Sequence, residues 1–155
     1  MRLAILPALL LFATTLFAQA QKAETKEGTA KAAFSKMLTN ATLHGTWAPI
    51  DKKLLGDDKQ DGYHIVRATM KEGDTWEIVY RVKMQGRQID FPIPVTVKFA
   101  GDTAVMILKN SPVGIGQTWS ARILFHNDVY AGSWWSPGNT KKGIVSGTIT
   151  RVKSK

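Results

Sequence analysis

The 155-residue chain contains no cysteine. Disulfide bridges, thiolate metal sites and a lipid anchor on a cysteine are therefore excluded. The chain also lacks a glycine-rich phosphate-binding motif and the Gly-x-Ser-x-Gly elbow of serine hydrolases. We therefore predict no catalytic residues, no cofactor and a protein that is not an enzyme, with an enzyme of unrecognised site as an open alternative.

Acidic residues are scarce, because 12 Asp and Glu stand against 21 Lys and Arg and leave a formal net charge of +9. A field of this sign favours anionic partners, such as an anionic surface of the cell envelope. The basic residues are scattered and mostly alternate with apolar ones, which is typical of the solvated face of a sheet. A nucleic-acid partner is not predicted, because oligonucleotide-binding barrels are five-stranded and mostly intracellular, whereas this chain has about eight short-linked runs behind a predicted signal peptide.

Long apolar runs are absent after the first 20 residues, so no transmembrane segment is predicted there. The almost entirely apolar run at the start, 3–17, follows the basic Arg2 and leads into the small-x-small tripeptide Ala18-Gln19-Ala20. It is shorter than the roughly 20 apolar residues of a spanning helix. The pattern is typical of a signal peptide over residues 1–20, cleaved after Ala20, and predicts a secreted or periplasmic protein.

The remaining length suits a single domain, predicted over 31–155. Residues 21–30 are polar and of mixed charge, which predicts a flexible linker. A short amphipathic helix is expected over 30–38, because four apolar residues recur there at helical spacing: Ala33, Phe34, Met37 and Leu38.

From Ala41 onward the hydrophobic period changes to two, which is typical of half-buried strands. Clusters of Gly, Asp, Asn and Pro separate the alternating runs, and the predicted domain is therefore all-β. About eight runs are present: Ala41–Trp47, Tyr63–Met70, Thr75–Met84, Ile89–Phe99, Thr103–Lys109, Thr118–Phe125, Val129–Trp135 and Gly143–Val152.

Most connections between these runs are short, and 49–62 is the longest predicted loop of the body. Short connections place successive strands antiparallel and side by side. A meander of about eight strands leaves two exposed edges unless its first and last strands pair, so we predict an up-and-down β-barrel, with an open two-layer sandwich as the alternative. Pro92 and Pro94 cannot donate to a ladder and indicate an edge, a bulge or a bend in the fourth run.

The tripeptide Gly45-Thr46-Trp47, in the first run after a short helix, resembles the Gly-x-Trp signature of the calycins, which include lipocalins and avidins. The resemblance implies a lipocalin-like barrel with Trp47 at its closed end, covered by a basic side chain of the last strand, here Arg151. The lipocalin disulfide is impossible in this chain and the second lipocalin motif is not found. Tyr130–Trp134 also resembles a strand near the end of small exported bacterial proteins of unassigned function.

Aromatic residues are concentrated on the apolar faces of the runs. We predict that one end of the barrel stays open and binds a small apolar or amphiphilic molecule. The predicted lining is Trp76, Tyr80, Phe91, Met106 and Trp135, and the basic residues that could hold an anionic head group are Arg67, Arg122, Lys141 and Lys142. The alternative is a barrel packed solid with side chains, which would act as a structural or interaction module through its basic surface.

The three histidines, His44, His64 and His126, are far apart in the sequence and lack the short spacings that make a metal motif informative. No metal site is predicted. Asp57, Asp58 and Asp61 stand beside lysines, as is usual in a solvated loop.

Overall fold

The computed structural model describes residues 24–51, 54–84, 86–112 and 118–151. The predicted signal peptide, 1–20, lies outside these residues. Within them, no helix is long and apolar enough to cross a membrane.

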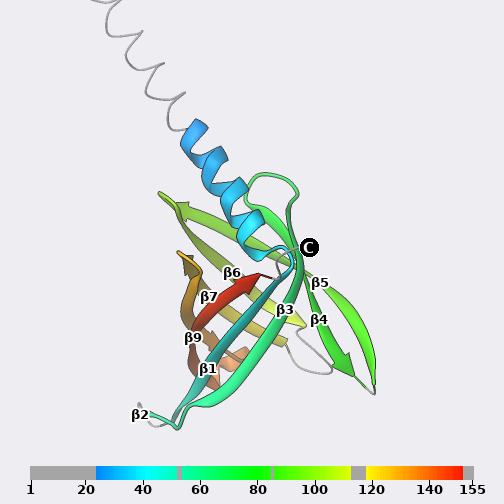
Figure 1. Ribbon diagram of the computed structural model, residues 1–155. Helices are drawn as coiled ribbons and strands as arrows, with labels where there is room; N and C mark the ends of the chain where they lie inside the picture. Colours follow the sequence, from blue (N-terminus) through cyan, green and yellow to red (C-terminus); the bar gives the residue numbers. More distant parts are fainter. Residues whose placement is uncertain (1–23, 52–53, 85, 113–117, 152–155) are drawn as a thin grey trace, which may run out of the picture.

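The described chain forms one antiparallel sheet that closes on itself (Figure 1). Its strands follow in sequence order, and β1 pairs with β9 in register from Ala41 opposite Arg151 to Pro49 opposite Gly143. The prediction of a closed up-and-down barrel is therefore confirmed, and the open sandwich is wrong. The strands are β1 (Ala41–Asp51), β2 (Leu54–Leu55), β3 (Lys59–Met70), β4 (Thr75–Met84), β5 (Arg87–Ala100), β6 (Thr103–Pro112), β7 (Thr118–His126), β8 (Val129–Trp135) and β9 (Lys142–Arg151).

Eight strands form the closed ring, because the two-residue β2 pairs only with the end of β1. In the segment predicted as a loop, 49–62, residues 49–51, 54–55 and 59–62 are instead strand. β3 begins at Lys59, directly opposite Trp47 of β1. The start of β3 is polar, so no alternation of apolar and polar residues marks it as a strand in the sequence. It still pairs with β1 because backbone hydrogen bonds do not require apolar side chains.

The hairpin turns use residues that tolerate a positive φ. Asn127 and Asp128 between β7 and β8 have φ values of 48° and 58°, as the type I′ turn of a two-residue hairpin requires. Such turns match the twist of the flanking strands and keep β7 and β8 in direct register from Ser120 to His126.

Residues 24–38 are helical, so the flexible linker predicted over 21–30 is wrong for residues 24–30. The reason is local: strong helix formers occupy this stretch, and Glu27 pairs with Lys31 at 2.8 Å one turn later. The buried face is formed by Ala30, Phe34 and Leu38, whereas Ala33 is exposed.

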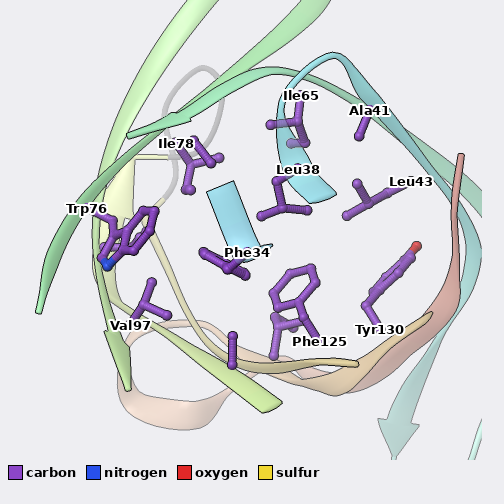
Figure 2. Close-up of a cluster of buried hydrophobic side chains, with 14 of the residues drawn as sticks. Phe34, Leu38, Ala41, Leu43, Ile65, Trp76, Ile78, Val97, Phe125 and Tyr130 are labelled. Atoms are coloured by element: carbon purple, nitrogen blue, oxygen red, sulfur yellow. The ribbon is translucent and has the colours of Figure 1, made fainter. Parts of the chain in front are cut away.

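The helix closes one end of the barrel, which we call the plugged end. The β3–β4, β5–β6 and β7–β8 turns lie at this end, and the opposite ends of these strands lie at the open end. Phe34 and Leu38, 2 % and 1 % exposed, enter the barrel from the helix (Figure 2). The Phe34 ring packs edge-on against Trp76, Phe99 and Phe125, with centroid separations of 5.1, 5.9 and 5.5 Å.

The ladder between β5 and β6 is short. β5 pairs with β4 over its whole length up to Thr96, but with β6 only from Thr96 to Ala100. The Val97 amide donates to the Asp74 carbonyl on the β4 side. Because successive residues of a strand direct their backbone N–H and C=O groups to opposite neighbours, the backbone groups of even-numbered β5 residues point toward β6. Pro92 and Pro94 have no N–H to donate on that side, which confirms the predicted edge and its cause.

The β4–β5 hairpin consequently extends beyond its neighbours at the open end (Figure 1). On its other side, the last pair between β4 and β3 is Arg81 opposite His64. We call residues 82–84 and 86–91 of this hairpin the arm. It presents half-buried apolar residues on its inner face, among them Val82, Ile89 and Phe91.

Candidate functional site

The open half of the barrel contains a cavity of about 740 Å³. Side chains from all eight strands of the ring line it, and most of them are apolar or aromatic. The apolar and aromatic lining consists of Leu43, Trp47, Tyr63, Ile65, Ile78, Tyr80, Val82, Ile93, Val95, Met106, Leu108, Trp119, Ala121, Ile123, Phe125, Tyr130, Trp134 and Val145. Phe125 also contacts Phe34, so the helix plug forms the floor of the cavity.

Inward-facing glycines allow large rings to lie against the barrel wall. A Cβ atom on Gly45 would overlap the Tyr130 hydroxyl and the carbonyl oxygen of Ser146. A Cβ atom on Gly143 would likewise overlap the Trp134 ring. Gly45, predicted as part of a structural signature, is thus needed here for the close approach of Tyr130 and of strand β9.

Tyr80 and Met106 line the cavity as predicted. Phe91 is not part of the lining itself, but its ring stacks on Tyr80 with a centroid separation of 5.6 Å. Trp76 faces inward at the plugged end, where it is 1 % exposed beneath Phe34. Its predicted role as a ligand contact is corrected to a role in the core, because the helix fills the space that a ligand would need.

Trp135 and Arg122 point away from this cavity, so neither lines it as expected, although Trp135 and Lys142 belong to a second hollow of about 560 Å³ at the β8–β9 connection. Strand alternation places Arg122 on the face opposite the inward Ile123, and Trp135 opposite the inward Trp134. The two residues instead meet outside the barrel, with the Arg122 guanidinium 5.4 Å from the Trp135 ring centroid.

The other proposed head-group residues also lie outside the lining. Arg67 pairs with Glu77 at 3.5 Å on the outer face. Lys141 and Lys142 are exposed at the β8–β9 connection. None of the four basic residues named for an anionic head group lines the cavity.

The predicted contact between Trp47 and Arg151 is also absent. In the antiparallel β1–β9 ladder Arg151 lies opposite Ala41, six residues from Trp47 along β1 and therefore roughly 20 Å away. Arg151 pairs with Asp128 at 3.6 Å. The cation over the Trp47 ring is Lys59, 4.8 Å from its centroid, and Trp47 lies toward the open end and not the end closed by the helix.

Asp61 is a cavity residue that the sequence analysis missed. It was assigned to a solvated loop with Asp57 and Asp58, which are indeed exposed. Asp61 of β3 lies directly opposite Gly45 of β1, so its side chain is on the same, inward face of the sheet. Its position two residues before Tyr63, an aromatic residue of the same strand, is the signal that could have identified it.

A polar site surrounds this carboxylate. Asp61 accepts a hydrogen bond from the Gly62 amide at 2.8 Å and a short one from the Tyr63 hydroxyl. Burial, and then the hydrogen bond to Asp61, raise the pKa of Tyr63. Burial also raises the pKa of Tyr130, with a further contribution from the negative charge of Asp61. Both phenols are therefore neutral donors at physiological pH.

The histidines occupy three separate outer positions. His44 contacts Thr150 at 3.1 Å, and His64 contacts Thr42 at 3.4 Å. His126 contacts Thr103 at 3.1 Å near the plugged end. Over the described ranges, no three His, Asp or Glu side chains are grouped so that they could hold a metal ion.

The chain was compared with protein-family models, with curated proteins and with solved structures, and none of these matches it. Similarity therefore assigns no family to it.

Proposed function

We propose that this protein is an exported carrier that binds a small apolar or amphiphilic molecule in the barrel cavity without transforming it. The observation that supports the proposal is the cavity itself, enclosed by side chains of all eight ring strands. Its volume of about 740 Å³ falls within the roughly 300–1,000 Å³ that is typical of ligand sites. The cavity also counts against the alternative of a solid-core module.

The aromatic residues near the mouth suit an apolar ligand. Trp134 packs edge-on against Trp47 and Trp119, with centroid separations of 5.6 and 5.2 Å. Rings held in this way offer large, rigid apolar surfaces. Each methylene group that a ligand buries against them contributes about 0.8 kcal/mol, so a long alkyl chain supplies enough free energy to offset the cost of immobilisation.

The two ends of the cavity differ in a way that suits reversible binding. The floor is the tightly packed plug around Phe34. The mouth lies beside the arm, where β4 and β5 have left their outer neighbours and carry half-buried apolar residues. Strands with fewer partners open at lower free energy than fully paired ones, so the arm is the natural entry side.

A fluorescence titration tests the proposal. The neutral probe N-phenyl-1-naphthylamine is expected to bind saturably, at one molecule per chain, and to quench the tryptophan emission. The substitution Ile123→Trp places a large ring in the cavity and should weaken binding at least tenfold. Its matched control is Leu124→Trp on the outer face, 43 % exposed, which should bind as the wild type does. Equal binding by the two variants, or no saturable binding, would exclude the cavity as the site.

A further inference from the structure

The carboxylate of Asp61 belongs to a largely apolar cavity, in which Arg81 and Lys83 are the other charged lining residues among those described. Among the described residues its hydrogen-bond partners are the Gly62 amide and the Tyr63 hydroxyl, and no lysine, arginine or histidine forms an ion pair with it. Asp61 is half-buried, and a carboxylate that loses part of its hydration is stabilised by a cationic partner. Here that partner is missing although the chain is rich in cations.

None of the described cations near the mouth forms an ion pair with Asp61. Lys59 lies over the Trp47 ring at 4.8 Å. Arg81 donates two hydrogen bonds to Asp90, of 2.6 and 2.9 Å, on the outer face of the hairpin. Lys83 is exposed and, like Arg81, belongs to the residues that line the cavity, but it forms no ion pair with Asp61. These cations therefore leave the charge of Asp61 uncompensated.

A second polar group is directed toward the same region. Tyr130 is 3 % exposed, and its hydroxyl has no hydrogen-bond partner among the described residues. This hydroxyl lies against Gly45, the residue opposite Asp61 on the neighbouring strand. A buried hydroxyl without a partner is unfavourable, and a ligand group at this position could bond to it.

We propose that the ligand carries a protonated amine, which binds the Asp61 carboxylate and donates to the Tyr130 oxygen while its apolar part fills the cavity. This inference rests on the proposed function and names its ligand class. The net positive charge of the protein does not oppose it strongly, because surface charges beyond roughly 8–10 Å are screened by salt. At contact distance in an apolar cavity, a charge-assisted hydrogen bond to Asp61 is much less screened.

The test uses three probes with the same twelve-carbon chain and different heads: dodecylamine, 1-dodecanol and dodecanoate. Each displaces N-phenyl-1-naphthylamine from the full-length protein near pH 7. We expect dodecylamine to displace the fluorophore at a concentration at least tenfold lower than the other two. A better or equal displacement by dodecanoate would overturn the inference and assign the head-group site to Lys83 or another cation.

Two variants locate the preference. Asp61→Asn should abolish the advantage of dodecylamine over 1-dodecanol. Asp58→Asn removes the same charge from an exposed residue close in sequence and should retain the advantage. A preference that survives in Asp61→Asn would overturn the assignment. The three probes on the wild type test the amine class even if that variant does not fold.

The two proposals fail in different ways. If the fluorophore binds but the three heads displace it equally, the cavity remains a ligand site and only the amine inference is wrong. If neither the fluorophore nor any twelve-carbon probe binds, the proposed carrier function is wrong as well.

Discussion

The plugged half and the open half of the barrel are built from the same eight strands but are filled in different ways. In the plugged half, Phe34 and Leu38 enter from the helix and pack against Trp76. In the open half, inward side chains leave a cavity of about 740 Å³. The interior of an eight-stranded barrel is so narrow that its own side chains can fill it completely, or leave room for one small ligand. In this barrel the helix fills only one end, and the other end keeps a cavity.

The halves also differ in their strand pairing. Near the plug, β5 and β6 are paired from Thr96 to Ala100, whereas toward the open end the prolines of β5 face the position of β6 without donors. The stable half is therefore fully paired and densely packed. The half that carries the cavity has the arm, whose backbone groups have fewer partners. Four predictions test this division, from the largest expected effect to the smallest.

Truncation of the plug should produce the largest loss of stability. Phe34→Ala removes a ring that contacts three aromatic residues and should lower the free energy of unfolding by about 3–5 kcal/mol. The exposed Lys36 lies two residues away on the same helix, and Lys36→Ala should change stability by less than about 0.5 kcal/mol. Urea unfolding followed by tryptophan fluorescence measures both. A similar, small effect for both variants would show that the helix is not the plug.

The second prediction tests the close contact of β1 and β9 in the open half. Gly45→Ala adds a Cβ atom that overlaps the Ser146 carbonyl and the Tyr130 hydroxyl, and should cost about 1–3 kcal/mol. Gly62→Ala is the control, because its Cβ would have ordinary contact at 3.6 Å with the Leu43 carbonyl oxygen. Thermal unfolding by circular dichroism compares the two. Equal melting temperatures would contradict the close approach.

The third prediction concerns the tyrosines around Asp61. Because the pKa values of Tyr63 and Tyr130 are raised in the folded state, their contribution to stability is complete below the ordinary value of 10.0 and is lost as the pH rises through the folded pKa. Asp61→Asn removes one cause of both shifts, so tyrosinate should appear at lower pH than in the wild type. Ultraviolet absorbance near pH 9–12 records the titration. An unchanged curve would place Asp61 away from the phenols.

The smallest effect is expected at the arm, where Arg81 binds Asp90. The hydrogen bonds from Arg81 hold the pKa of Asp90 below its ordinary range. A depressed pKa contributes stability above the unfolded-state pKa, and this contribution is lost as the pH falls through the folded value. Asp90→Asn should therefore slightly flatten the acid side of the stability curve, since an exposed pair contributes little. A large loss of stability near pH 7 would contradict this role.

The architecture could be predicted because apolar residues recur at every second position over long stretches of the sequence. The bounds of β4 and β8 agree with the predicted runs, and Pro92 and Pro94 mark the edge of β5. Face parity within one strand also placed Tyr80 and Met106 correctly. These features depend on local geometry alone, in which each side chain points to one side or the other.

The errors concern residues whose position depends on a distant strand. Trp135 and Arg122 lie near strand ends but on the outer faces of β8 and β7. The predicted contact of Arg151 with Trp47 fails because the register of the β1–β9 ladder places Arg151 opposite Ala41. Asp61 was missed because its neighbours are polar and its inward direction follows from pairing with Gly45. Register across a closed ring is decided by many pairs at once.

By itself, the sequence determined that apolar and polar side chains alternate along strands, that turns separate these strands, and that the strands pair in sequence order. Period-two patterns and turn residues act over only a few positions, so they can be recognised without the tertiary structure. Only the tertiary structure decided which half would be solid and which hollow. The helix can fill the plugged end only after closure has brought Trp76, Phe99 and Phe125 around one ring. The same closure, through the pairing of Asp61 with Gly45, turned an ordinary polar residue toward the cavity.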